Sequence, residues 1–128
     1  MFLLVQFNKS RYINMMLSNL KEKIRYGKEP DNPMLISLWL TEEERCRDIK
    51  NTQQDLSCHY QAQFYLLLEA VADELNPAHW RRVCLDNIYK PICSLQRTAQ
   101  TEVSRQKVQK LLQELAVTCE YVKHSLHH

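Results

Sequence analysis

Three observations predict that this chain folds as an all-α domain, in a bundle or a short solenoid-like stack of four to five helices around one long central helix. Apolar residues recur at helical spacing in several segments. Gly27 is the only glycine, whereas hairpins and glycine-rich phosphate loops need residues that tolerate positive φ. Prolines and short polar stretches separate the apolar segments. The length of 128 residues suits a single helical domain over residues 1–128, either a whole protein or a fragment of a longer one.

The core of the central helix is predicted over residues 60–75. An ordinary surface helix has one apolar stripe, whereas this segment is apolar around much of its circumference. A helix of this kind is normally enclosed by its neighbours, so we expect the other helices to pack around it. The apolar residues that recur at helical spacing are Tyr60, Phe64, Leu67, Val71 and Leu75.

The first helix is predicted to end at Gly27, because glycine is the residue best suited to a left-handed C-cap. It is expected to begin with Ser10 as its N-cap, or earlier if residues 2–7 join it. Residues 30–33 (PDNP) predict a turn after it. The apolar stripe of this helix consists of Ile13, Met16, Leu17, Leu20 and Ile24.

Residues 34–40 (MLISLWL) predict a short helix, since the chain offers no partner for a strand. Thr41 and Glu44 then form a capping-box pattern, which predicts the start of another helix. No residue from there to Asn76 breaks a helix, so we expect the long central helix to be continuous over about ten turns.

Asn76 and Pro77 predict the end of the central helix, because proline disfavours helical conformation in the preceding residue. The same pair suits an N-cap and the first residue of the next helix. Pro91 removes a backbone hydrogen bond inside that helix, so we expect a kink or a break there. A polar loop over 96–101 precedes the last helix. Its apolar stripe consists of Val108, Leu111, Leu112, Leu115, Cys119, Val122 and Leu126.

The cysteines and the hydropathy pattern predict an intracellular protein, in the nucleus or the cytoplasm. The five cysteines are odd in number and contain no C-x-x-C pair, which favours a reducing compartment over a disulfide framework. The apolar run at the N-terminus is too short for a signal peptide. No run approaches the roughly 18–20 apolar residues that cross a bilayer, so we expect no membrane partner.

The net charge of +2 is unevenly distributed along the chain. Residues 1–29 contain six basic and two acidic side chains, residues 30–76 contain three and nine, and residues 77–128 contain eight and four. Packing of oppositely charged helices side by side is the simplest explanation. The alternative is that a basic flank meets an acidic partner or a phosphate backbone.

No group of residues in the sequence indicates catalysis. Cys58 and His59 with Cys84 and Cys93 lack the short ligand spacing that is typical of zinc sites. Nothing selects one cysteine and one histidine as a nucleophilic pair. The dinucleotide and phosphate-loop fingerprints are absent. The sequence therefore predicts a protein that is not an enzyme and uses no metal and no cofactor.

The first functional hypothesis is a non-catalytic protein–protein interaction domain, a scaffold or adaptor in an intracellular complex of several subunits. Its partner would be another protein or a second copy of the chain. Tryptophan and arginine are enriched in interface hot spots, and a short apolar segment can dock into a partner groove. Trp80 also lies on an apolar stripe, which favours the core. The candidate contacts are Phe2, Leu3, Leu4, Trp80, Arg81 and Arg82.

The alternative hypothesis is a nucleic-acid-binding helical domain that uses its basic flanking helices. It requires that basic residues from separate segments share one face, which a sequence does not establish. The candidate residues, together with Arg81 and Arg82, are Lys21, Lys23, Arg25, Arg105, Lys107 and Lys110.

Overall fold

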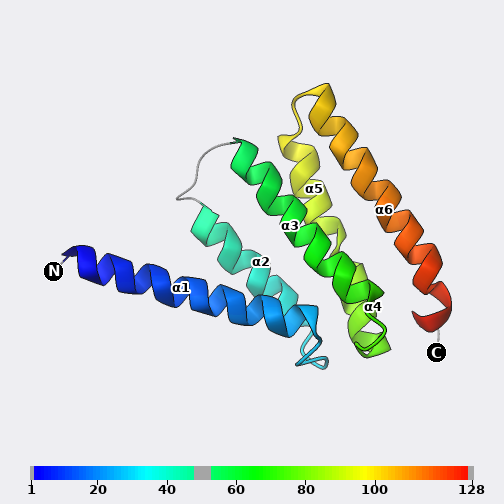
Figure 1. Cartoon of the computed structure of the whole chain (residues 1–128), viewed down its shortest axis with the longest axis horizontal. Helices are drawn as coiled ribbons and strands as arrows, with labels where there is room; N and C mark the ends of the chain where they lie inside the picture. The colour runs from blue at the N-terminus through cyan, green and yellow to red at the C-terminus, as the bar shows by residue number, and fades with distance from the viewer. Residues whose placement is uncertain (1, 48–52, 127–128) are drawn as a thin grey trace.

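The computed structural model describes the backbone of residues 2–47 and 53–126, in which every regular element is an α-helix (Figure 1). Side chains are described for residues 11–46 and 56–126. The helical elements confirm the predicted all-α architecture. No helix in these ranges is long and apolar enough to cross a membrane. The helices are α1 (Phe2–Arg25), α2 (Met34–Arg47), α3 (Gln53–Ala72), α4 (Ala78–Asn87), α5 (Tyr89–Thr98) and α6 (Glu102–Leu126).

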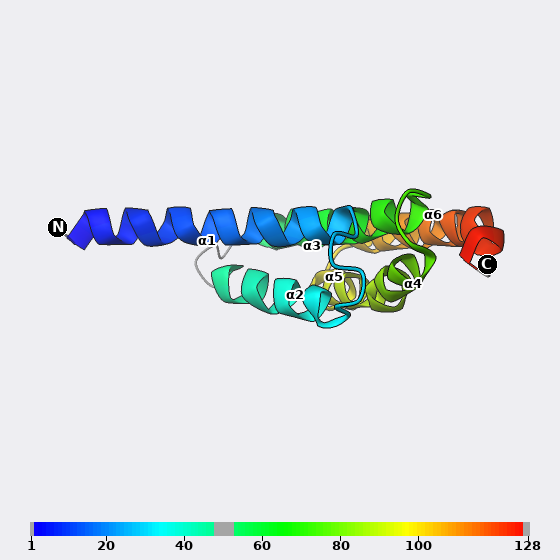
Figure 2. The same ribbon diagram turned by 90° about the horizontal axis from the view of Figure 1, so that it is seen from below.

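The helices form two layers (Figure 2). Helices α1, α3 and α6 lie side by side in one layer, and α2, α4 and α5 form the other. Helix α3 is central, since it contacts α1, α4, α5 and α6. The chain alternates between the layers, which is the solenoid-like form of the predicted architecture.

The predicted apolar face of the central helix is buried, with one exception. Phe64, Leu67 and Val71 are fully enclosed, and Tyr60 is 3% exposed. Leu75 is 94% exposed, because α3 already ends at Ala72 and the following turn carries Leu75 outward. The prediction for Leu75 was therefore wrong.

The prediction of one continuous helix from Thr41 to Asn76 was also wrong. Helix α2 runs through Thr41 without a break, because Leu35, Ile36 and Trp39 are buried in the core and hold this segment helical. Helix α2 packs back on α1, and α3 runs antiparallel to α2 (Figure 1). The central helix is consequently shorter than α1 and α6. Residues 48–52 of the predicted helix lie outside the described residues.

The predicted break near Pro91 occurs three residues earlier, at Ile88. Pro91 falls in the first turn of α5, where backbone N–H groups have no partner within the helix, so its missing N–H costs nothing there. If α4 and α5 are counted as the one broken helix that the sequence predicts, the described residues form five helices, in agreement with the prediction, and counted separately they form six.

Gly27 ends α1 as predicted, whereas Ser10 is not its N-cap because the helix begins at Phe2. Gly27 has a φ of 56°, in the left-handed region. The N–H of Lys28 donates to the carbonyl of Lys23, and the N–H of Gly27 donates to that of Ile24. This pair of hydrogen bonds defines a Schellman motif.

Ion pairs join the basic first helix to the acidic middle of the chain, as the simple explanation of the charge pattern predicts for that helix. Arg25 Nη1 lies 2.7 Å from Asp73 Oδ2, and Arg25 Nε lies 3.4 Å from Glu69 Oε2. Lys21 Nζ lies 3.3 Å from Glu43 Oε1 on α2.

Candidate binding cleft between α2 and α5

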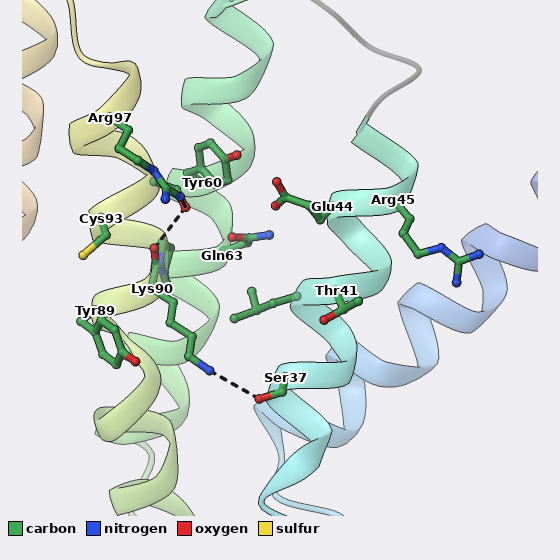
Figure 3. A pocket seen from close by; sticks show the side chains of 13 residues that line it. Ser37, Thr41, Glu44, Arg45, Tyr60, Gln63, Tyr89, Lys90, Cys93 and Arg97 are labelled. Atoms are coloured by element: carbon green, nitrogen blue, oxygen red, sulfur yellow. Dashed lines mark hydrogen bonds between the residues drawn. The ribbon is translucent and has the colours of Figure 1, made fainter.

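A cleft of about 660 Å³ lies between α2 and α5, with α3 as its third wall (Figure 3). It exists because α2 packs mainly on α1, while α5 packs mainly on α3. The two helices of the same layer therefore stand apart. A volume of this size is within the range of ligand-binding pockets.

The apolar part of the cleft comes from all three of these helices. Tyr60 of α3 and Pro91 of α5 are buried, and Leu40 of α2 is half-buried. Tyr89 lies at the edge of the cleft with 56% of its surface exposed. The cleft thus has an apolar interior and an aromatic side chain at its rim.

The polar rim is most basic on the α5 wall. Lys90 Nζ reaches across to Ser37 Oγ on α2 at 3.4 Å (Figure 3). Arg97 Nη2 donates to Ser94 Oγ at 3.1 Å. On the opposite wall, Glu44 points toward α5.

A buried carboxylate beneath the cleft positions Gln63, one of its lining residues. Glu43 of α2 is 5% exposed and accepts hydrogen bonds from Trp39 Nε1 at 2.6 Å and from Gln63 Nε2 at 3.0 Å. His59 Nε2 lies 3.4 Å from the same carboxylate. Lys21 adds a contact from α1. This network fixes α2 against α1 and α3, and so fixes one wall of the cleft.

All five cysteines are free thiols, and they differ in accessibility. Cys93 lines the cleft and is exposed, and Cys58 is exposed outside it. Cys84 is enclosed in the core, where burial raises the pKa of its thiol to about 12. Among the described residues, no three His, Cys, Asp or Glu side chains are close enough together to hold a metal ion.

A second, smaller cavity of about 440 Å³ lies between α3, the end of α5 and the start of α6. Its lining is mostly polar at the α5–α6 connection and includes Lys107. Thr101 closes this connection, because its Oγ1 accepts a hydrogen bond from the N–H of Ser104 and caps α6.

The structure places Trp80 and Arg81 in the interior, which argues against their predicted role as partner contacts. Trp80 is fully buried and donates from Nε1 to the carbonyl of Ile24 at 2.8 Å. Arg81 is 2% exposed and donates from Nε to the carbonyl of Val71 at 2.7 Å. Its charge therefore lies at the C-terminus of α3, where the helix dipole favours a cation. A cation near the N-terminus of α4 opposes the dipole of that helix, and the contact with the end of α3 explains why Arg81 is there.

Arg82 and the N-terminal segment remain predictions. Arg82 is exposed, and its Nη1 donates to the carbonyl of Leu126 at the end of α6. Phe2, Leu3 and Leu4 belong to α1, but their side chains lie outside the described ones. Helix α1 projects beyond the rest of the molecule at this end (Figure 1).

The basic residues of the nucleic-acid hypothesis come from two separate helices. Three lie on α1 and three on α6, on either side of α3. The three on α1 are each paired with a carboxylate of the chain. The α1 group is Lys21, Lys23 and Arg25, and the α6 group is Arg105, Lys107 and Lys110.

The residues that line the cleft were not among those predicted from the sequence. Lys90 and Arg97 are seven residues apart on α5, a helix that contains no acidic residue. That pattern was a signal for a basic helix face. The opposing wall comes from α2, about 50 residues earlier in the chain, and no local pattern indicates that the two would face each other.

Comparisons with protein-family models, with curated proteins and with solved structures find no match to this chain.

Proposed function

We propose that this chain is a non-catalytic protein-binding domain, a scaffold or adaptor of an intracellular complex, which receives a segment of another protein in the α2–α5 cleft. The cleft itself carries the proposal, because it combines an apolar interior with a polar rim. Grooves that accept peptide helices have this composition.

Two further observations support the proposal. The cleft is lined by Cys93 but by no histidine, so a cysteine–histidine nucleophilic pair has no place in it. The free thiols fit a reducing compartment, the nucleus or the cytoplasm. The nucleic-acid alternative has less support, because its residues lie on separated helices.

Selection from a random peptide library on the immobilised protein tests the proposal. We expect binders that lose at least about tenfold in affinity for Thr41→Trp, which fills the cleft from its exposed α2 side. The matched control is Gln113→Trp, on an exposed position of α6 outside the cleft. Circular dichroism verifies that both variants fold.

Alkylation of the cysteines gives an independent measure of where the peptides bind. A bound peptide should slow the alkylation of Cys93 and leave that of Cys58 unchanged. Cys84 should stay unreactive throughout, which shows that the fold is intact. Failure to select any binder, or binders that ignore Thr41→Trp and leave Cys93 unprotected, would overturn the proposal.

A second copy of the chain is the other partner to be tested. Tyr12 and Met15 of α1 are 69% and 72% exposed, which offers an apolar surface for self-association. Light scattering over a concentration series measures the mass. A monomer at all concentrations would remove self-association from the proposal.

A further inference from the structure

The α5 wall of the cleft carries two cations whose charges are not neutralised within the described part of the molecule. Lys90 and Arg97 contact the hydroxyl groups of Ser37 and Ser94, and neither has a carboxylate within ion-pair distance among the described side chains. Helix α5 contains no acidic residue. On α1, by contrast, carboxylates of the chain pair with Lys21, Lys23 and Arg25. The α5 wall is therefore complementary to an anionic partner.

The spacing of the two cations indicates the geometry of that partner. Seven residues of helix correspond to about two turns and about 10.5 Å along the axis. Two acidic residues seven positions apart on a partner helix are separated by the same distance as Lys90 and Arg97, and their side chains lie on one face of that helix. In an extended segment side chains alternate between two faces, and neither two nor four residues spans about 10.5 Å, so a helix fits this spacing better.

Other residues that line the cleft favour a partner helix with an apolar face beside its acidic residues. The half-buried Leu40 and the exposed Tyr89 offer the partner uncharged, largely apolar surface, while Tyr60 and Pro91 are buried beneath them. Glu44 points into the cleft from α2 (Figure 3). Its negative charge disfavours the partner's acidic residues on the α2 side, so they would lie on the α5 side. Arg45 points away from the cleft and pairs with Glu42.

We infer that the cleft binds an acidic amphipathic helix, whose apolar face covers the cleft and whose two carboxylates, two turns apart, pair with Lys90 and Arg97. The inference rests on the proposed function and specifies the kind of segment that the cleft binds. It assigns Lys90 and Arg97 as the residues that select that partner by charge.

The peptides selected on the wild-type protein provide the test. We expect them to carry Asp or Glu at a spacing of seven, with apolar residues between at helical spacing. The double variant Lys90→Glu, Arg97→Glu should bind them at least about tenfold more weakly, because two attractions become repulsions. The matched control is Lys107→Glu, Lys110→Glu, which makes the same charge change on α6, outside the cleft.

A charge exchange separates recognition from damage to the fold. The same peptide with lysines in place of its two acids should bind the Lys90→Glu, Arg97→Glu variant and lose affinity for the wild type. Recovery of this kind requires a folded cleft. Binding to the wild type should also weaken as the salt concentration rises.

The outcomes distinguish this inference from the proposed function. Peptides that protect Cys93 but contain no acidic pair, or that bind both double variants alike, would overturn the acidic partner and leave the binding cleft standing. A proline placed midway between the two acids that leaves the affinity unchanged would overturn the helical geometry. Peptides that ignore Thr41→Trp would overturn the cleft as the binding site and this inference with it.

Discussion

Gly27 occupies a position where both the backbone and the surrounding space exclude a larger residue. Its positive φ closes α1, and a Cβ atom there would lie 3.0 Å from Trp80 Cδ1 and 3.3 Å from Asn76 Oδ1. Trp80 cannot move away easily, because its indole donates to the carbonyl of Ile24. The end of α1 and the start of α4 can approach this closely only at a glycine.

Gly27→Ala should lower the free energy of unfolding by about 2 kcal/mol, as measured by urea denaturation, because the left-handed conformation and the contact with Trp80 both oppose it. Gly27→Asn is the control, since asparagine tolerates the left-handed region but carries the same Cβ atom. We expect it to destabilise as well. Full stability of the asparagine variant would show that the contact with Trp80 is unimportant.

Asp73 connects the end of α3 to α1 through a charge that depends on pH. The hydrogen bond from Arg25 at 2.7 Å, and a second from the N–H of Leu75 at 3.0 Å, hold the pKa of the Asp73 carboxyl below its ordinary value. The ionised carboxylate therefore contributes stability above about pH 4, the pKa range of an unfolded aspartate, and this contribution is lost as the pH falls through the lower pKa of the folded state.

Asp73→Asn should lower the free energy of unfolding by about 1 kcal/mol at pH 7, and its difference from the wild type should shrink at acidic pH. Urea denaturation at pH 7 and pH 3 measures both quantities. Glu69→Gln is the matched control, because Glu69 meets the same arginine from a more exposed position and should have a smaller effect. A difference that is independent of pH would contradict this account.

At the scale of elements, the segment from Asn76 to Arg82 joins the C-terminal ends of all three helices of one layer. Asn76 Nδ2 donates to the carbonyls of Arg25 on α1 and Ala70 on α3, and Trp80 binds the end of α1. Arg81 and Arg82 bind the ends of α3 and α6. Parallel helices gather their negative dipole ends at one place, and two arginines and two neutral donors satisfy them there.

The two adjacent arginines make a matched pair for mutation. Arg81→Met should lower the free energy of unfolding by about 3 kcal/mol, because it leaves the Val71 carbonyl without its buried donor. Arg82→Met should cost about 1 kcal/mol or less, since its side chain is exposed. Chemical denaturation of both variants provides the comparison. Equal effects would show that the burial of Arg81 is not what matters.

The buried Glu43 carboxylate is the corresponding link between α1, α2 and α3. Glu43→Ala should lower the free energy of unfolding by about 2–3 kcal/mol, because it leaves the indole N–H of Trp39 and the amide of Gln63 without their acceptor. Glu44→Ala, at the neighbouring exposed position, should change it by no more than about 0.5 kcal/mol. Equal losses in thermal denaturation of the two variants would contradict the assigned role of Glu43.

At the scale of the whole molecule, the helices of the two layers differ in how many neighbours they pack against. Helix α3 packs against four other helices, whereas α2 packs mainly against α1 and borders the cleft. Local opening should therefore be easier for α2 than for α3. A cleft wall with this mobility can adapt to the segment that it binds.

Amide hydrogen exchange measured by mass spectrometry should show slower exchange in α3 than in α2. A peptide bound in the cleft should raise the protection of α2 more than that of α6, because only α2 borders the site. Equal protection of α2 and α3 in the free protein would mean that they open as one unit.

The sequence by itself determined the helical class, the buried face of α3 and the end of α1. These features follow from local rules, since a stripe at helical spacing and a glycine after it act over a few residues. The charge pattern also predicted correctly that the basic first helix meets the acidic middle of the chain. Two local predictions were wrong, namely that one helix continues from Thr41 to Asn76 and that Leu75 is buried. Both features depend on long-range packing.

Only the tertiary structure decided where the chain turns back and what its polar residues do. Helix α2 packs on α1 and is a separate element from α3, so the single long helix that the local pattern permits does not form. Arg81 is structural because α4 carries it to the end of α3, ten residues earlier in the chain. The cleft has no local signature, since its walls on α2 and α5 are brought together through α1 and α3. Surfaces of this kind arise from contacts between distant segments, which no periodicity in a sequence encodes.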